Sequence, residues 1–554
     1  MEITEKNNNN EDKVSELVKL CVGDANSFSN IFLLICIAGV SFGILLEIVN
    51  VVIRNQKFNK DNCVERPQYW VFSNQNDVEN RNGLLKHVHS VLERVGYEKS
   101  SNQTPWDLLW SHDFPFNALQ GSLLKLKPHQ RVNHFPGTGY ITNKVTLATS
   151  NSKYIPKAFQ LPKSKAEFLE YAAKNKDSLF LEKHNRHRGV RLKNVSEIDV
   201  SSGESFVQEY VQKPFLVDGH KFDIGVYVVL TSVDPLRAYW YKGDVLFRYC
   251  PAKYYPFDPN NLDKYVIGDD YLPTWEVPSL AQAHSALGHG MKDAFDIYVR
   301  SKGKDPLAMW KEIQKAISEV LAMNEHHIVT ALKRYPSRDN FFEMMRFDLI
   351  VDEDLKVYLL EANMSPNLSS AHFKPNALLY EQVLYNLFSL TGVSHKPKTN
   401  HIFNTKMHVS SGPFCQNCLN HELSYIQIKN LHNYLKKCGP TNMHFGLTSL
   451  FFSDRIAAQS MVSAHKNIAV FGDSCQTTCK EDCEASNLCK LCKPCLEGKL
   501  KNALLKAHSE FVHRGDFRRL IPPPMSLVMN LSAMNKLQHL WFQGKCNDDI
   551  TWCT

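Results

Sequence analysis

The sequence predicts a mixed α/β (α+β) fold for the central part of a chain that has several domains. Short runs of β-branched and aromatic residues, bounded by polar turns, predict strands. One long segment, Pro306–Tyr335, repeats apolar residues at helical spacing and predicts an amphipathic helix. At 554 residues the chain is too long for one ordinary core, so we expect two or three domains.

The composition is that of a globular protein, with 43% hydrophobic and 22% charged residues. The formal net charge of +7 is small for this length, and no concentrated basic arm occurs. These features permit an acidic partner, and we expect no nucleic-acid partner.

The N-terminal region predicts a membrane anchor. Residues 1–30 are acidic and Asn-rich, so we expect them to be disordered. Residues 31–53 form a largely apolar run that is long enough to cross a bilayer as one helix. Its carboxylate, Glu47, would lie near one end of the span, where a charge costs less than at the centre. A buried helix of a soluble domain is the alternative.

Two features give opposite indications of the side on which the large C-terminal part lies. The span is followed by more basic residues than precede it, which places that part in the cytosol: Arg54, Lys57, Lys60 and Arg66 follow, against Lys13 and Lys19. A cysteine-rich tail favours the secretory lumen or the cell exterior, because disulfides persist mainly there. The sequence therefore predicts a single-pass membrane protein of undecided orientation.

Residues 68–395 form the domain that carries the candidate site. We expect strands at 69–72, 178–183, 206–211 and 221–230, a helix at 84–95, a strand or turn at 106–110, and a strand pair at 238–248 that turns at 242–244. In the strand at 221–230, alternation places Lys221, Asp223 and Gly225 on one face. That charged row either faces a ligand or forms a solvent-exposed edge.

The most informative stretch, residues 341–369, predicts two strands, 347–351 and 357–360, joined by an acidic turn. Side chains alternate along a strand, so Glu361 and Asn363 share a face, and Asp348 lies roughly opposite Glu361 if the strands pair. Two carboxylates and an amide oxygen are the hard ligands that Mg²⁺ prefers when it also holds phosphate. An edge hairpin with solvated acids is the alternative.

Two loops carry candidate phosphate-binding lysines. A polar, Gly- and Pro-containing loop at 130–139 precedes Lys144, and Lys183 ends a short strand before the basic loop at 184–188. A lysine at a strand end beside such a loop suits phosphate binding through charge and backbone N–H groups. A solvated basic turn is the alternative for the second loop.

Five segments occur in the order seen in the tubulin–tyrosine ligase-like family, which residues 68–395 therefore resemble. They are QRVNHFPGTG with Lys144, Lys183 with Gly189-Val190, VQEYVQKPFLVDGHKFD, DPLRAYWYKGDVLFR, and FFEMMRFDLI with LLEANMSPNLS. The resemblance implies an ATP-grasp-like fold, in which mixed sheets hold ATP and Mg²⁺. Members of the family join tyrosine, glutamate or glycine to tubulin tails through an acyl-phosphate.

The resemblance also implies a role for each matching residue. It makes Asp348, Glu361 and Asn363 the Mg²⁺ ligands, and it places Lys144 and Lys183 on the ATP phosphates. It makes Gln208, Glu209, Tyr210 and Val211 the lining of the adenine pocket. It has Lys221 and Asp223 face the nucleotide or the incoming amino acid, and Arg248 support the reacting carboxylate, so Asp223 and Arg248 are the candidate catalytic residues.

The chain departs from the family pattern on the substrate side. The family has an arginine where this chain has Gly225, and we expect no side chain to replace the missing guanidinium. The family also has a glycine where this chain has Arg346. A His-Leu-Thr-Asn segment expected near residues 265–271 is absent, the loop after Lys183 has lost a glycine, and a lysine usual near 375–381 is missing. These departures predict altered or lost ligase activity.

The tail, residues 396–554, lies outside the resemblance and contains eleven of the fifteen cysteines. Zinc held by Cys415 and Cys418 with Cys492 and Cys495, or with His421, is one interpretation. We favour disulfides, because the cluster is too crowded for one metal, and their connectivity cannot be deduced from spacing. A basic helix is expected within 499–519.

The favoured function is that of a membrane-anchored ligase of this family, dependent on ATP and Mg²⁺ and similar to tubulin polyglutamylases that act on microtubules. One alternative is an inactive, nucleotide-binding adaptor that contacts partners through its cysteine-rich tail. Another is an ATP-dependent ligase that acts on a non-tubulin acidic chain outside the cytosol.

Overall fold

The strand β9 (Phe222–Val233) runs through the middle of the sheet that carries the candidate site. This computed structural model describes residues 66–73, 83–100, 105–184, 190–201, 205–395, 468–477, 479, 482–524 and 532–553. The sheet has the order β13-β12-β9-β10-β14, and β11 also pairs with β9. The other strands are β10 (Leu236–Tyr241), β11 (Leu246–Tyr249), β12 (Glu343–Val351), β13 (Val357–Asn363) and β14 (Phe517–Ile521).

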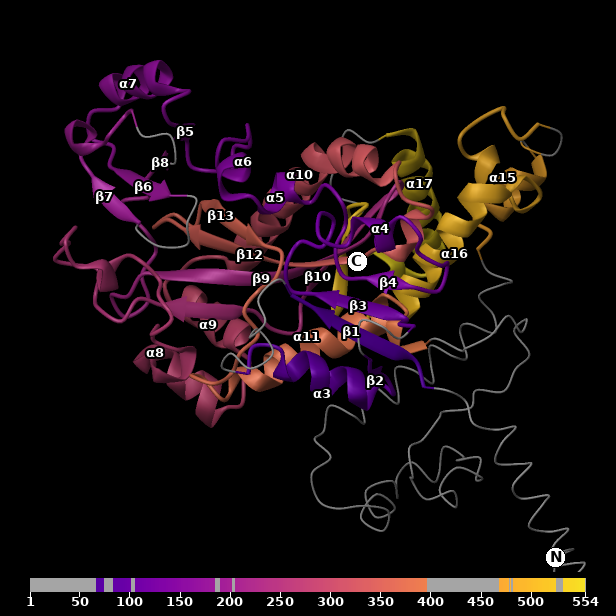
Figure 1. Cartoon of the computed structure of the whole chain (residues 1–554), viewed down its shortest axis with the longest axis horizontal. Helices are drawn as coiled ribbons and strands as arrows, with labels where there is room; N and C mark the ends of the chain where they lie inside the picture. The colour runs from indigo at the N-terminus through magenta and orange to yellow at the C-terminus, as the bar shows by residue number, and fades with distance from the viewer. Residues whose placement is uncertain are drawn as a thin grey trace, which may run out of the picture. The chain divides into compact units, whose positions relative to one another are not determined.

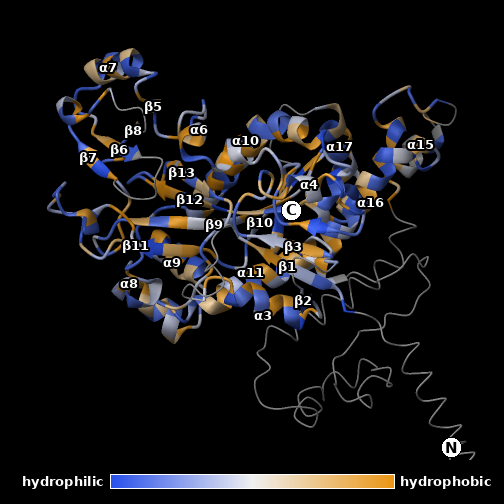
Figure 2. Ribbon diagram, in the orientation of Figure 1, coloured by the Kyte–Doolittle hydropathy of each residue, from blue (hydrophilic) through white to orange (hydrophobic). Residues whose placement is uncertain are grey.

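Helices cover this sheet, and its central strands are buried on both faces. All of β12, and β9 from its start to Leu230, is buried. The long helix α10 (Pro306–Leu332) contacts β9, β10 and β13, while α9 (Met291–Ser301) contacts β11. Figure 2 shows the hydrophobic colour along the central strands, whereas the helices carry both colours. Burial of apolar area against these helices is the main stabilising contribution to the fold.

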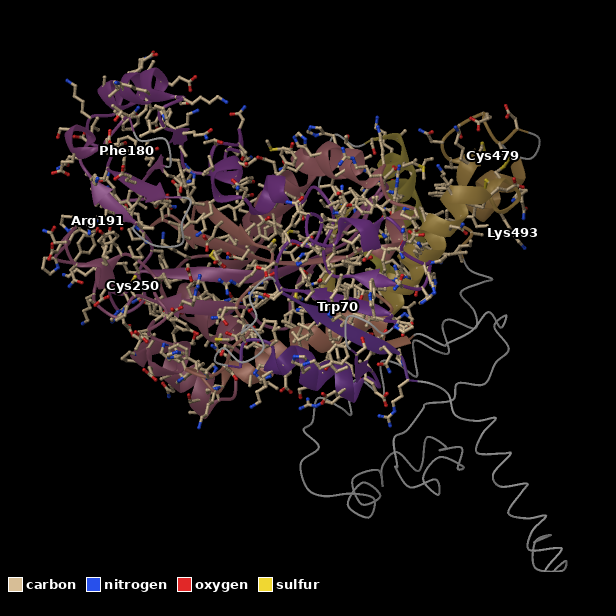
Figure 3. The ribbon with its side chains drawn as sticks, viewed as in Figure 1. Trp70, Phe180, Arg191, Cys250, Cys479 and Lys493 are labelled. Atoms are coloured by element: carbon tan, nitrogen blue, oxygen red, sulfur yellow. A yellow bond between two sulfur atoms is a disulfide. The ribbon has the colours of Figure 1, made fainter. Side chains whose placement is uncertain are left out.

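Two smaller sheets flank the central one. The first is parallel, with the order β2-β1-β3-β4, and consists of β1 (Gln68–Phe72), β2 (Glu98–Lys99), β3 (Leu108–Ser111) and β4 (Arg131–Val132). The second is antiparallel, with the order β5-β8-β6-β7, and consists of β5 (Ala158–Gln160), β6 (Phe180–His184), β7 (Arg191–Lys193) and β8 (Ser205–Glu209). Figure 3 labels Trp70 on the parallel sheet, and Phe180 and Arg191 on the antiparallel one.

Further α-helices lie in the part of the chain before residue 396. They are α3 (Lys86–Arg94), α4 (Gln120–Leu123), α5 (Gly139–Thr142), α6 (Lys144–Ala148), α7 (Lys165–Lys174), α8 (Pro278–Ala281) and α11 (Asn376–Leu390). Asn143 caps α6 by accepting the N–H groups of Val145 and Thr146. The cap fixes the start of α6 and therefore the position of Lys144.

The elements predicted around residues 69–95, 178–183, 221–230, 306–335 and 347–360 are confirmed, with ends shifted by a few residues. The strand pair predicted at 238–248 is wrong in one respect: β10 and β11 each pair with β9 and not with each other. Asp244 leaves the sheet between them and accepts the N–H groups of Met291 and Lys292 at the start of α9. The segment that was expected to reverse the chain therefore serves as a helix cap.

The residues after 467 contribute directly to the central sheet. After α16 (Gly498–Val512), which accounts for part of the helix predicted at 499–519, the chain forms β14, and β14 pairs antiparallel with β10. Arg237 of β10 forms a buried ion pair with Glu510 of α16, and Asn535 of α17 (Ala533–Asp548) accepts the N–H of Leu236. The cysteine-rich region and the candidate site are thus parts of one folded unit (Figure 1).

The predicted membrane helix at 31–53 and the tail at 1–30 lie outside the described residues. Within the described ranges, no helix is both long and apolar enough to cross a membrane.

Candidate active site

The acidic edge of the site forms where β12 and β13 pair. In their antiparallel register, Asp348 lies opposite Glu361, as the hairpin pattern predicted. The amide Nδ2 of Asn363 donates to Oδ2 of Asp348 at 3.0 Å and to Oε1 of Glu361 at 3.2 Å. The predicted convergence of Asp348, Glu361 and Asn363 is therefore observed.

Glu361 and Lys144 join the edge of β13 to the start of α6. Lys144 Nζ lies 3.1 Å from Glu361 Oε2, and both side chains are about one-third exposed. Burial alone would raise the pKa of Glu361, but Lys144 and Asn363 outweigh it and lower the pKa to about 2. Glu361 is therefore ionised at neutral pH and carries the negative charge that a metal ligand needs.

Lys183, on β6, lies close enough to Glu361 and Lys144 for their charges to affect its pKa. Its Nζ donates to Oε1 of Gln208, on the neighbouring strand β8, at 2.7 Å. Desolvation lowers the pKa of Lys183 to about 8, opposed by Glu361 and reinforced by Lys144 and Lys221. These lysines and Glu361 therefore lie close enough together to influence one another's charge.

Lys221, immediately before β9, is buried and held by the backbone. Its Nζ donates to the carbonyl of Tyr265 at 2.7 Å and lies 5.5 Å from the centre of the Tyr210 ring. Burial lowers the pKa of Lys221, an effect that Cys250 and Asp223 oppose. The Tyr265 carbonyl was not predictable from the sequence, because a backbone oxygen has no residue-type signal.

A buried network of arginines and aspartates occupies the neighbouring part of the sheet. Arg248, on β11, donates to both oxygens of Asp223, at 2.9 and 2.6 Å, and to Oδ2 of Asp348 at 3.0 Å. Arg346, on β12, donates to both oxygens of Asp348, at 2.7 and 2.9 Å. Burial raises the pKa of Asp223, and Arg248 opposes that rise. The predicted pair of Asp223 and Arg248 is thus in contact, within a network that is larger than predicted.

Only part of the predicted adenine lining points toward these lysines. Gln208 binds Lys183, whereas Glu209 lies on the other face of β8 and accepts from Tyr171 and Ser178. Side-chain alternation along a strand explains this difference. Tyr210 and Val211 lie after the end of β8, and the Tyr210 hydroxyl donates to the hydroxyl of Tyr254 at 3.1 Å. Side-chain adenine contacts from Gln208 or Tyr210 remain a prediction, and Glu209 is positioned for a structural role.

The donor types around the acidic edge suit magnesium and phosphate. Two carboxylates and an amide form a hard set for Mg²⁺, and the ammonium groups of Lys144, Lys183 and Lys221 supply positive charge beside it. Asn363 Nδ2 donates to both carboxylates, and Asp348 also accepts from Arg248 and Arg346, so a bound Mg²⁺ would replace some of these hydrogen bonds. This arrangement of acids and lysines is typical of enzymes that bind a nucleoside triphosphate together with a divalent cation.

The amino-acid sequence supports a specific family. Residues 122–401 match the model of the tubulin-tyrosine ligase family. The chain is 36% identical over 482 residues to the probable tubulin polyglutamylase ttll-15 of Caenorhabditis elegans, covering 85% of this chain and 84% of that protein. The chain belongs to the tubulin-tyrosine ligase family, whose members use ATP and Mg²⁺.

Other relatives match over a smaller share of their own length. The chain is 26% identical over 362 residues to the mouse tubulin polyglutamylase TTLL6, covering 62% of this chain and 43% of that protein. It is 27% identical over 326 residues to the human tubulin monoglutamylase TTLL4, covering 55% of this chain and 26% of that protein. The chain is thus homologous to tubulin glutamylases, which are ATP-dependent ligases.

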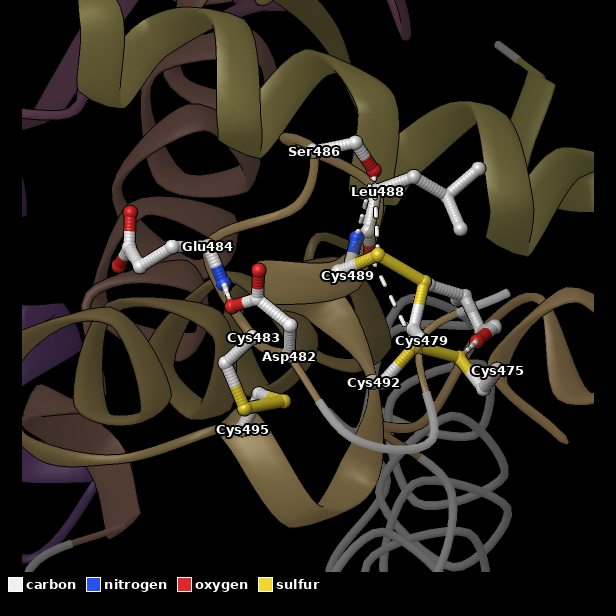
Figure 4. The surroundings of a disulfide bond; sticks show 11 residues. Cys475, Cys479, Asp482, Cys483, Glu484, Ser486, Leu488, Cys489, Cys492 and Cys495 are labelled. Atoms are coloured by element: carbon white, nitrogen blue, oxygen red, sulfur yellow. Dashed lines mark hydrogen bonds between the residues drawn. A yellow bond between two sulfur atoms is a disulfide. The ribbon is translucent and has the colours of Figure 1, made fainter. Parts of the chain in front are cut away.

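The cysteines of the tail form four disulfides among the described residues. Three lie close together, Cys475–Cys492, Cys479–Cys489 and Cys483–Cys495 (Figure 4), and the fourth joins Cys546 to Cys553. The prediction of disulfides is confirmed for these eight residues, so Cys492 and Cys495 are not free to bind zinc. The other residues of the zinc interpretation, Cys415, Cys418 and His421, lie outside the described part of the chain.

Proposed function

We propose that this protein is an ATP- and Mg²⁺-dependent ligase that adds glutamate to an acidic polypeptide. The observation that carries the proposal is the contact between Lys144 and the Asp348–Glu361–Asn363 edge, with Lys183 close by. Glutamate is the favoured amino acid because the relatives described above are glutamylases by name. Those names also make tubulin the first acceptor to test.

Each residue has a proposed role that follows from its chemistry. Glu361, Asn363 and Asp348 hold Mg²⁺, and Lys144 and Lys183 contact the phosphates of ATP. When bound, Mg-ATP supplies the phosphoryl group that converts a carboxylate into an electrophile which an amine can attack. Asp223 accepts two hydrogen bonds from Arg248. These bonds orient the guanidinium of Arg248 for the reacting carboxylate of the substrate.

The experiment is ATP-dependent incorporation of labelled glutamate into peptides with the sequence of tubulin tails. Wild-type protein should incorporate label, and Lys183→Met should incorporate far less. Incorporation that does not depend on ATP would contradict the proposal. ATP binding without incorporation into any acidic peptide would favour the alternative of an inactive adaptor.

A second candidate substrate is favoured by the disulfides. Cytosolic thiols are kept reduced, so a chain with four disulfides is typical of the secretory lumen or the cell exterior. Because β14 and α16 belong to the same folded unit as the site, the site would lie in the same compartment as these bonds. We therefore propose an acidic secreted or lumenal polypeptide as the second acceptor to test.

The compartment can be tested by protease protection in sealed vesicles. We propose that residues 31–53 anchor the chain and that the folded part lies on the lumenal side. The tail should then be cleaved only after detergent opens the vesicles. Cleavage in intact vesicles would place the site in the cytosol and favour tubulin as the acceptor.

A further inference from the structure

Asn194 lies directly after β7, the edge strand of the antiparallel sheet. The order of the described strands is β5-β8-β6-β7, so β7 pairs only with β6 (Figure 1). In the register of that pair Lys193 lies opposite Phe180, three residues before Lys183 along β6. A group attached to Asn194 would therefore lie at the end of β7 that is farther along β6 from Lys183.

The turn that contains Asn194 is exposed and is held by backbone groups. Both Asn194 and Ser196 are exposed. The N–H of Glu197 donates to the backbone carbonyl of Asn194 at 3.0 Å, and the N–H of Asn194 donates to Oε2 of Glu197 at 3.0 Å. These two bonds use the backbone of Asn194, so a substituent on its side-chain nitrogen breaks neither of them.

Asn194-Val195-Ser196 has the pattern of an acceptor for N-linked glycosylation, which is asparagine, any residue except proline, then serine or threonine. Such acceptors are modified in secreted proteins at surface positions, in the environment where disulfides also persist. The four disulfides belong to the same folded unit as β7. The exposed turn and the disulfides are independent observations that indicate the same modification.

We propose that Asn194 carries an N-linked oligosaccharide. In the reaction Nδ2 of Asn194 loses a proton and forms a bond to C1 of the first sugar. The bond between that carbon and a polyprenyl diphosphate carrier breaks, and the diphosphate is the leaving group. The inference rests on the proposed lumenal location of the folded part. A glycan at this position would also shield the free edge of β7 from pairing with another chain.

Three other asparagines have the same pattern, at positions 102, 367 and 530. Asn102 and Asn530 lie outside the described residues. Asn367 is exposed, but it follows Asn363 by four positions, so an oligosaccharide there would stand beside the candidate metal site. Asn194 is thus the described acceptor whose modification leaves that edge of the site open.

The test is peptide mass spectrometry of the full chain, expressed in animal cells with its own N-terminal region, before and after N-glycosidase treatment. Wild-type protein should carry a glycan at Asn194. Asn194→Gln and Ser196→Ala should each lose it, whereas Ser196→Thr should retain it because the hydroxyl is kept. Asn117→Gln is the matched control, because Asn117 is exposed and Ala118-Leu119 follow it. Its glycan at Asn194 should be unchanged.

Protease protection and glutamate incorporation on the same protein separate the possible failures. An unmodified Asn194 in protein whose tail is protected overturns the inference and leaves the lumenal location standing. A tail that is cleaved in intact vesicles overturns both. A mass increase that persists in Ser196→Ala overturns N-glycosylation as its cause. A glycosylated protein that incorporates no glutamate supports this inference and contradicts the proposed ligase function.

Discussion

Lys183 and Gln208 are joined by a 2.7 Å hydrogen bond between neighbouring strands of the outer antiparallel sheet. The bond holds the ammonium of Lys183 in an environment where desolvation lowers its pKa to about 8. Because this pKa is close to neutral pH, the charge of Lys183 is sensitive to mildly alkaline pH.

Mg-ATP affinity should fall as the pH rises from 7 to 9. Below a pKa of about 8 the lysine is charged and attracts phosphate, whereas above it the neutral amine does not. Bound phosphate raises that pKa, so the loss should develop above pH 8. The measurement is affinity against pH for wild type and Lys183→Met. The variant should bind weakly at both pH values, and an unchanged pH dependence in the variant would show that another group is responsible.

Breaking the buried pair Arg237–Glu510 should destabilise the whole folded unit. The pair joins β10 to α16 through two hydrogen bonds of 2.8 Å. Glu510→Gln leaves a buried guanidinium without its counter-charge, which should lower the free energy of unfolding by about 3 kcal/mol. The measurement is urea unfolding monitored by tryptophan fluorescence.

The control for that variant is Glu170→Gln, which breaks the exposed pair of Glu170 and Lys174. Because solvent screens an exposed pair, we expect little change in stability. If Glu510→Gln proved as stable as this control, the Arg237–Glu510 pair would contribute nothing to the stability of the folded unit.

Removing the Cys479–Cys489 disulfide should loosen the cysteine-rich segment. The cluster packed around it consists of other disulfide cysteines and Leu488, so little apolar core remains without the bonds. Replacing both cysteines with serine opens a loop with a sequence separation of 10, a change expected to cost about 2–3 kcal/mol. The measurement is the rate of proteolysis between residues 475 and 495.

Cys250→Ala is the matched control for the serine variant, because Cys250 is a buried free cysteine outside that cluster. Its proteolysis rate in the tail should match that of wild type. An equal rate in the double serine variant would show that the segment is held by other contacts.

The sequence was most informative where local rules determine the structure. The hairpin at 341–369 was predictable because alternation and an acidic turn fix which side chains meet, and Asp348 does lie opposite Glu361. The same rule, applied to residues 206–211, would have separated Glu209 from Gln208.

Long-range relationships were not predictable in this way. The pairing of β14 with β10 joins residues about 280 positions apart, and no local pattern marks a strand at 517–521 as part of that sheet. The contact of Arg248 with Asp348 likewise depends on strand order. The pairing of Arg346 with Asp348 was predictable, however, because the two residues are two positions apart and therefore share a face of one strand.

The most direct test of the proposed site is calorimetric binding of Mg-ATP to wild type and Glu361→Gln. Removing one charged ligand should weaken binding by about tenfold or more, since an interaction with a charged group contributes on the order of 1.5–3 kcal/mol. The loss should be much smaller when ATP is titrated without Mg²⁺. Equal affinity of the two proteins for Mg-ATP would contradict the placement of the metal at Glu361 and Asn363.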